Sequence, residues 1–321
     1  MFVRQLEYLV ALARERHFGR AAESCHVSQP ALSGAIRHLE QELDVVIVQR
    51  SHRFIGFTPE GERILAWARQ TRAALDGLKQ EASASHAQLS GVLRIGAIPS
   101  AMPLVSQLTG ACWRDAPGIS FQVVSLSTEE ITRRLDAFEL DLGMTYLEDP
   151  RLDGFRTQLL YEERYVLLMN LATQRKTFAT SPLTLTWQDL EGLPLCLLTS
   201  NMQNRRIINA AFRRARVQPT VVVETDSIFA LYTHVKCAGL SSVVPHSLLG
   251  PFALDDDDVY TIPIMPELLH SVGLVGINHD SMPPLQSTAW RIASTIDIAP
   301  ELNPQVPRRR VPRHRVSGVV K

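Results

Sequence analysis

The chain has 321 residues, and its 33 Lys and Arg balance 33 Asp and Glu, so the formal net charge is zero. This length predicts two or three domains, and 45% hydrophobic with 21% charged residues is ordinary for a globular protein. No apolar run is long enough to cross a bilayer, and the charged N-terminal stretch does not resemble a signal peptide. We therefore expect a cytoplasmic protein.

Three helices are predicted at the N-terminus. Residues 2–15 repeat apolar side chains at helical spacing. A second helix begins near Phe18, and a third runs from about Ser28 to Leu43 after a break at residues 25–28. Small apolar residues on the second helix would let the third cross it closely. A short helix, a tight turn and a longer helix are typical of a helix-turn-helix, although any two packed helices show a similar pattern.

Polar side chains gather at the start of the third helix. Ser28 is suited to cap this helix, because its hydroxyl can accept a hydrogen bond from a backbone amide of the first turn. Pro30 is tolerated there, since the first turn loses no hydrogen bond to it. In a helix-turn-helix this exposed start contacts base edges and phosphates. The candidate DNA-binding residues of this helix are Ser28, Gln29, Pro30, Ser33 and Arg37.

Residues 45–57 predict two short strands around Ser51–Arg53, which together form a winged hairpin. Arg50 and Arg53 at its tip suit contacts to phosphate or the minor groove, which position a protein without reading sequence. A solvated turn is the alternative for both arginines. The first sixty residues hold seven Arg against seven Asp or Glu, so DNA binding must depend on local placement of charge.

The first 65 residues also contain a specific combination of motifs. An alanine pair precedes the turn, SQPALS opens the third helix, IRHLEQELD follows it, and TPEG closes the wing. This combination resembles the N-terminal region of LysR-type transcriptional regulators. Ile47 and Val48 depart from the Leu-Phe pair that the family usually has before the wing arginine, which leaves the packing of the wing open. The resemblance implies double-stranded operator or promoter DNA as a partner, and RNA polymerase as another.

Residues 59–89 predict one long helix, because no proline follows its start. At ~1.5 Å per residue it forms a rod of roughly 45 Å. Apolar residues spaced by three and four make a seam that one small domain cannot cover. We expect a partner helix from a second subunit, as the resemblance also implies; packing on the chain's own C-terminal domain is the alternative. The predicted dimerisation residues are Ile64, Ala68, Thr71, Leu75 and Leu78.

From residue 91 onward, strand patterns alternate with helix patterns, which predicts βαβ units and a parallel sheet. Two α/β lobes with a late return crossing resemble the effector-binding domain of the same family, which is similar to periplasmic binding proteins. Lobe one is predicted at 91–163 plus 270–298, and lobe two at 164–269. The Pro- and Arg-rich residues at 299–321 predict a disordered basic tail.

The expected fold class is therefore an α+β multidomain protein. Its parts are a winged helix-turn-helix at 1–58, a linker helix and hinge at 59–90, a two-lobed α/β periplasmic-binding-protein-like domain at 91–298, and the tail.

Hydroxyl or amide side chains follow four of the predicted strands, at the starts of helices. In doubly wound sheets a ligand binds beyond the carboxyl ends of the strands, where helix N-termini present unpaired N–H groups. Such donors favour a small anion, with a carboxylate expected, and Arg205 or Arg206 could add a charge. Ordinary helix capping explains each hydroxyl equally well. By position, and in part by resemblance to the family, the effector-binding candidates are Ser100, Ser127, Thr128, Tyr146, Thr199, Asn201, Asp226 and Pro245.

Motifs for an enzyme or a metal are missing. The chain has no GxGxxG after a strand, no P-loop, no HExxH and no GxSxG. Its four cysteines lie far apart, without the spacing of a zinc site or a redox pair. Some relatives sense oxidants through two nearby cysteines, but Cys196 in the run LPLCLL has no close partner, so we do not expect that mechanism. No cofactor and no metal are predicted.

The sequence thus predicts a LysR-type transcriptional regulator that is controlled by a small-molecule effector and is not an enzyme. The resemblance implies association as a dimer of dimers, a homotetramer. The alternative is a small-molecule binding or transport protein without a DNA-regulatory role.

Overall fold

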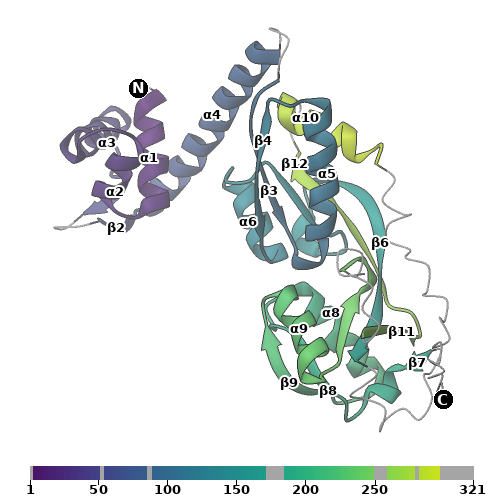
Figure 1. Ribbon diagram of the computed structural model, residues 1–321. Coiled ribbons are helices and arrows are strands. Elements are labelled where there is room, and N and C mark those ends of the chain that lie inside the picture. Colours follow the sequence, from purple (N-terminus) through teal and green to yellow (C-terminus); the bar gives the residue numbers. More distant parts are fainter. Residues whose placement is uncertain are drawn as a thin grey trace, which may run out of the picture.

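The computed structural model describes residues 3–50, 54–84, 89–170, 184–248, 259–278 and 282–296. A small N-terminal domain continues into a long helix, which leads to a larger two-lobed α/β body (Figure 1). Arg53, most of the predicted hinge and the tail lie outside the described residues, as does the side chain of Arg50. No described helix is long and apolar enough to span a membrane.

Three helices and a hairpin form the N-terminal domain, as predicted. Ala21 and Ala22 are buried, so the second helix lies close against its neighbours, and Leu32, Ile36 and Leu39 fill the core beneath the third. The elements are α1 (Val3–Glu15), α2 (Phe18–Ser24), α3 (Gln29–Leu43), β1 (Val48–Arg50) and β2 (Phe54–Phe57).

The hairpin begins later than the predicted residue 45. One carboxylate oxygen of Glu40, on α3, accepts hydrogen bonds from the backbone amides of Ile47 and Val48, each at 2.9 Å. Both apolar side chains are buried in the N-terminal core. The departure from the family's usual Leu-Phe pair is therefore accommodated in the core, and Glu40 ties the base of the wing to α3.

The linker helix is α4 (Pro59–Ala84), which is shorter than the helix predicted over residues 59–89. The hydroxyl of Thr58 accepts a hydrogen bond from the amide of Gly61 at 2.8 Å, which caps the first turn. Gly61 lies against the carbonyl of Ile47, and a Cβ built there would be 2.1 Å from that oxygen. The glycine of the TPEG motif therefore lets the linker approach the wing closely.

Lobe one contains a parallel arrangement of strands in the order β4-β3-β5. Helices α5 and α10 lie together beside these strands, and α6 lies next to β3 (Figure 1). The elements are β3 (Gly91–Ala97), η1 (Pro99–Ala101), α5 (Met102–Asp115), β4 (Ile119–Ser125), α6 (Thr128–Asp136), β5 (Leu142–Tyr146), η2 (Pro150–Leu152) and α10 (Pro284–Ala293).

One long strand, β6 (Phe155–Asn170), connects the lobes and crosses the predicted boundary between residues 163 and 164. It pairs with β12 (Leu269–Ile277), β11 (Val259–Met265) and β10 (Ser242–Pro245). The sheet order is β4-β3-β5-β12-β6-β11-β7, with β10 paired to β6.

Lobe two is built around the parallel pair β8 and β9. Trp187 packs edge-on against Phe212 with ring centroids 5.3 Å apart, in the main core. The short strand β7 and strand β11 were not predicted. The remaining elements are β7 (Leu185–Thr186), η3 (Trp187–Leu190), β8 (Pro194–Leu198), α8 (Gln203–Ala215), β9 (Thr220–Thr225), α9 (Ile228–Ala238) and η4 (His246–Leu248).

The close approach at Gly61 leads to a test of stability. Gly61→Ala should destabilise the protein by roughly 1–3 kcal/mol or more, because the new methyl group would overlap a backbone carbonyl that cannot move alone. Urea unfolding followed by circular dichroism measures this change. Gly34→Ala on α3 is the control, since nothing lies within 4 Å of its Cβ and alanine favours a helix by about 1 kcal/mol. Equal stability of both variants would contradict the packing described at Gly61.

Candidate functional site

The start of α3 presents the predicted DNA-binding residues. His26, in the turn before it, has a left-handed backbone with φ of 56°, and the hydroxyl of Ser28 accepts a hydrogen bond from the amide of Ala31 at 3.4 Å. Gln29 and Arg37 are exposed and Ser33 is half-buried on the same side of the helix, spaced by four residues. These side chains therefore form one polar face above a packed core.

A hollow lies between α3 and the base of the wing. It is lined by Arg37, Glu40, Val46, Val48 and Gln49. Gln49 is exposed beside Arg37 and was not singled out from the sequence. Its amide can both donate and accept hydrogen bonds, so Gln49 extends the polar face of α3 towards the wing.

The exposed face of the linker helix differs from the face that the sequence predicted for dimerisation. Ala68 is 1% exposed and Ile64 packs beside it, both in the core of the N-terminal domain. Ala68 is therefore not available to a partner helix, which corrects the prediction for that residue, whereas Ile64 is half-buried against the same core. Trp67 at 68% and Leu78 at 66% exposure lie outside. The exposed face of α4 consists of Trp67, Thr71, Ala74 and Leu78.

The same helix also contacts its own C-terminal domain, which was the alternative weighed from the sequence. The side chain of Gln80 accepts a hydrogen bond from the amide of Leu285 at the start of α10, at 3.3 Å. Arg69 forms an ion pair with Glu139 of lobe one at 3.2 Å. The helix thus packs on lobe one and still leaves one face open.

Polar side chains from both lobes meet around one buried carboxylate, that of Glu163. The hydroxyl of Tyr146, at the end of β5, donates to Glu163 at 2.6 Å. Ser100, which follows β3, lies 3.2 Å from the same tyrosine hydroxyl. Glu163, Ser100 and Tyr146 are each 1% exposed. Two predicted effector-binding residues therefore come together, around an acid that the sequence analysis did not select.

The cluster extends into lobe two. The hydroxyl of Tyr165 lies 2.9 Å from the hydroxyl of Tyr146. It accepts a hydrogen bond from the side-chain amide of Asn204, on α8, at 3.3 Å. Ser247, in η4, donates to Glu163 at 3.5 Å, and Tyr161 donates at 3.2 Å. We call these residues the interlobe cluster: Ser100, Tyr146, Tyr161, Glu163, Tyr165, Asn204 and Ser247. In this arrangement, side chains of both lobes meet where the effector cleft was predicted.

A sequence signal for Glu163 existed in the stretch YEERY. Tyr161, Glu163 and Tyr165 alternate along β6, and the residues between them, Glu162 and Arg164, are exposed. Successive side chains of a strand point to opposite faces. An acid flanked at a spacing of two by tyrosines is thus placed on the buried face with hydroxyl donors beside it.

Burial sets the protonation of the interlobe cluster. It raises the pKa of Glu163 from its ordinary 4.5 to about 7, against the opposing effect of hydrogen bonds from Tyr146 and other hydroxyls. Burial also raises the pKa of Tyr146 and Tyr165 well above 10, so both phenols stay protonated. The His270 ring packs edge-on against both tyrosines, and its Nδ1 lies 3.6 Å from Glu148.

The other predicted effector-binding residues lie apart from this cluster. Thr128 is buried and its hydroxyl is 2.8 Å from that of Thr145, on the strand that ends at Tyr146. The Ser127 hydroxyl caps α6 by accepting from the amide of Glu130 at 3.3 Å. Pro245 pairs with Tyr165 in the sheet. These three residues therefore border the cluster, and their contacts are with Thr145, Glu130 and Tyr165.

On lobe two, the prediction is less well supported. The hydroxyl of Thr199 donates to the exposed Asn201 at 2.7 Å, and Asp226 is exposed. Arg205 is buried and directed elsewhere, since its guanidinium contacts the carbonyl of Leu198 at 2.7 Å and Glu224 at 2.8 Å. Arg205 is thus used within lobe two, whereas Arg206, the other residue considered for this charge, is exposed.

Comparison with known proteins agrees with this architecture. Residues 3–62 match the profile of a bacterial regulatory helix-turn-helix protein of the lysR family, and residues 86–293 match that of the LysR substrate binding domain. The chain belongs to the LysR family. It is 31% identical over 297 residues to the DNA-binding transcriptional dual regulator OxyR of Escherichia coli K12, covering 92% of this chain and 95% of that one.

Two further similar proteins match different shares of the chain. A hydrogen peroxide-inducible genes activator of Pectobacterium carotovorum is 38% identical over 172 residues, which cover 51% of this chain and 57% of the relative. The match thus spans less than two thirds of that relative. A full-length OxyR variant from Pseudomonas aeruginosa has the same fold, with a TM-score of 0.73 at 27% identity, covering 93% of this chain and 98% of that one.

The cysteines of this LysR-family chain are all free thiols. Cys112 and Cys196 are buried, and burial raises the pKa of each to about 11, so both remain protonated near neutral pH. Cys25 is half-buried and Cys237 exposed. Among the described residues, no three His, Cys, Asp or Glu side chains are placed to hold a metal ion.

The buried acid leads to a prediction of pH dependence. Because the folded pKa of Glu163, about 7, exceeds its ordinary 4.5, the neutral acid favours folding, and this contribution is lost as pH rises from about 4.5 to about 7. Glu163→Gln lacks this titration. The free energy of unfolding of the variant should therefore rise relative to wild type across that window, by on the order of 3 kcal/mol, and stay level above it.

Urea unfolding at a series of pH values measures this difference. Glu162→Gln is the matched control, because it makes the same change on the exposed face of the same strand. A difference between Glu163→Gln and wild type that is independent of pH would contradict the raised pKa.

Proposed function

We propose that this LysR-family protein regulates transcription by binding double-stranded operator or promoter DNA, under the control of a small molecule bound between its lobes. The polar face at the start of α3 carries the proposal. Gln29 and Arg37 are exposed on it, Ser33 lies between them, and Ser28 caps the helix. An exposed first turn with amide, hydroxyl and guanidinium groups can contact base edges and phosphates. A binding or transport protein has no use for such a face.

Self-association is proposed through the exposed face of α4. Trp67, Thr71, Ala74 and Leu78 are spaced by four, three and four residues, the spacing of a helix that pairs with another helix. Large apolar side chains that are this exposed favour a partner surface, and a second copy of the same helix offers a matching one. Pairing of such dimers into a homotetramer, and contact with RNA polymerase, complete the proposed regulator.

The effector is proposed to bind at the interlobe cluster, where strand ends and helix starts of both lobes meet. The small anion expected from the sequence would encounter Glu163 there, while Arg205 is held by Leu198 and Glu224. An ionised carboxylate beside a buried acid is disfavoured unless one of the two is protonated. We therefore narrow the proposed effector to a neutral molecule, or an acid bound in its protonated form, that donates hydrogen bonds to Glu163.

The names of the relatives raise a second possibility, a response to hydrogen peroxide. Reaction with peroxide needs an accessible thiolate. Cys112 and Cys196 are buried with pKa values of about 11, and Cys237 is exposed but distant in sequence from any other cysteine. We therefore propose control by reversible binding of the effector and not by thiol oxidation.

Specific binding to DNA tests the proposal directly. Wild-type protein should bind its own upstream DNA ~10³-fold or more tighter than scrambled DNA at near-physiological salt. Gln29→Ala and Ser33→Ala should each reduce this preference by ~1–3 kcal/mol, because they remove groups that can read base edges. Fluorescence anisotropy with labelled DNA measures both.

Ser106→Ala, at an exposed position on α5 of lobe one, is the control and should leave the preference unchanged. Equal affinity of wild type for both DNAs would count against specific regulation at this site. Loss of nonspecific and specific binding together in Gln29→Ala would instead assign that residue a role in folding.

The linker face has its own test. Trp67→Ala should raise the dissociation constant of the dimer at least about tenfold, because a large aromatic side chain on a pairing face carries much of its binding energy. Sedimentation velocity across a concentration series measures it. Lys79→Ala, next to Leu78 but off the exposed apolar face, is the control. An unchanged dissociation constant for Trp67→Ala would exclude this face as the interface.

A further inference from the structure

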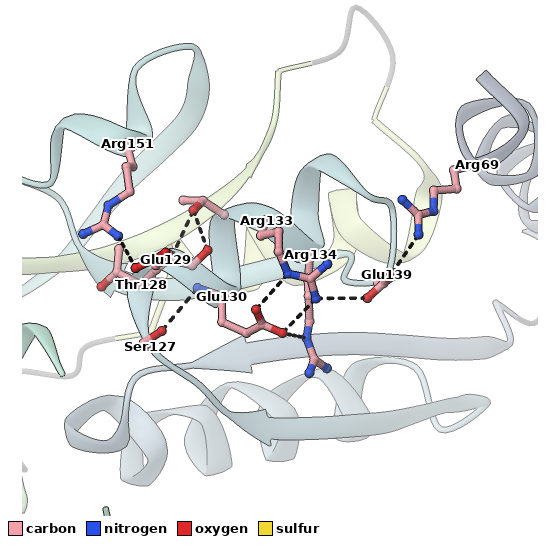
Figure 2. Close-up of polar contacts among 10 residues, drawn as sticks. Arg69, Ser127, Thr128, Glu129, Glu130, Arg133, Arg134, Glu139 and Arg151 are labelled. Atoms are coloured by element: carbon pink, nitrogen blue, oxygen red, sulfur yellow. Dashed lines mark hydrogen bonds and ion pairs between the residues drawn. The ribbon is translucent and has the colours of Figure 1, made fainter. Parts of the chain in front are cut away.

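Helix α6 lies between the interlobe cluster and the linker helix. Its first residue, Thr128, is buried and contacts Thr145, the neighbour of Tyr146. Just beyond its last turn, Glu139 contacts Arg69 on α4 at 3.2 Å. Figure 2 shows Ser127 and Thr128 at one end of the helix and Glu139 with Arg69 at the other. One short element therefore touches both functional parts of the chain.

Packing and hydrogen bonds make α6 a rigid unit. Ile131 and Leu135 are fully buried in the main core and hold one face of α6. The hydroxyl of Thr132 donates to the carbonyls of Thr128 and Glu129, which closes the first turn on itself. The two ends of α6 are consequently joined by one ordered, hydrogen-bonded helix.

Charged side chains continue along the outer face of α6. Arg133 donates two hydrogen bonds of 2.8 Å to Glu130, and Arg134 donates another of 2.7 Å. The hydrogen bond from Arg133 is the main cause that lowers the pKa of Glu130 to about 2, so this carboxylate is ionised. Arg133 also lies 3.7 Å from Glu139. Glu139 is thus placed between two guanidinium groups, those of Arg133 and Arg69.

Arg69 connects Glu139 to the linker helix. Its side chain is 20% exposed in the contact with lobe one. The Nε of Arg69 is buried and has no hydrogen-bond partner among the described residues, so Glu139 is the carboxylate that the structure gives this guanidinium. Ala68, the residue before it, is buried in the N-terminal core. Arg69 therefore joins lobe one to the part of α4 that is fixed to the DNA-binding domain.

We propose that Glu139 and Arg69 are positioning residues, which set the orientation of the DNA-binding domain relative to lobe one in response to changes at the interlobe cluster. This inference rests on the proposed function. A change at Tyr146 shifts β5 and Thr145, Thr145 shifts the start of α6, and the end of α6 shifts the linker helix through the ion pair.

Partly exposed ion pairs contribute only about 0–1 kcal/mol to stability. Removing the Glu139–Arg69 pair should therefore leave the protein folded and able to bind DNA. Removing the pair should instead change the coupling between the interlobe cluster and the DNA-binding domain, which is measured separately from stability.

The experiment is a double-mutant cycle on the full-length protein bound to its own upstream DNA. Tyr146→Phe perturbs the interlobe cluster by removing one hydroxyl, and Glu139→Gln removes the ion pair. The affinity for the DNA is measured by anisotropy, and its bending by energy transfer between dyes at the two DNA ends. With the pair intact, Tyr146→Phe should change the specific dissociation constant ~5-fold or more, within the usual range of coupling between sites.

In the Glu139→Gln background, Tyr146→Phe should change affinity and bending little, by less than about twofold. Glu129→Gln is the matched control, because it removes an ion pair of the same length, 3.2 Å to Arg151, from the same helix without a contact to α4. The coupling should persist in that control. It should also be retained in the conservative variant Glu139→Asp, which keeps the carboxylate.

Each outcome decides the inference. Full coupling in Glu139→Gln, loss of coupling in Glu129→Gln as well, or no effect of Tyr146→Phe in the otherwise intact protein would each overturn it. Wild-type protein that does not prefer its own upstream DNA would instead refute the proposed function, so the two failures are distinguishable.

Discussion

The buried carboxylate of Glu163 is the constraint on which the arrangement of the two lobes depends. Removing a carboxylate from water costs several kcal/mol unless hydrogen-bond donors replace the solvent. Here Tyr146 of lobe one, Tyr161 of the shared strand and Ser247 of lobe two supply those donors. Because the donors come from both lobes, opening the lobes would leave the acid short of partners. A ligand that enters must therefore replace them.

The linker helix is under a different constraint, because a single helix packs against two parts of the chain and also presents an exposed apolar face. Ala68 belongs to the core of the N-terminal domain, Arg69 and Gln80 contact lobe one, and Trp67 with Leu78 remains exposed. Residues one position apart on a helix point about 100° apart, so the three roles fit within neighbouring positions. The same geometry means that any rotation of α4 against lobe one would also turn the exposed face and the DNA-binding domain.

The two halves of the candidate site differed in how far the sequence could predict them. The start of α3 depends on local chemistry, so the cap at Ser28 and the exposed face at Gln29 followed from a few adjacent residues. At the effector site, Ser100 was predicted from the end of a strand and Tyr146 from the resemblance to the family, and the structure places their hydroxyls 3.2 Å apart. Glu163 was missed because its importance comes from packing between lobes, although the alternation in YEERY placed it on the buried face.

By itself, the sequence determined the family, the helices of the DNA-binding domain and the existence of a long linker helix, because periodicity and capping act within a few residues. Only the tertiary structure decided that Ala68 is internal, that Arg205 pairs with Glu224, and that Arg69 meets Glu139, 70 positions away in the chain. Contacts of that range depend on how whole elements pack against each other. Local spacing can indicate which face of an element is buried, but it does not show which other element covers that face.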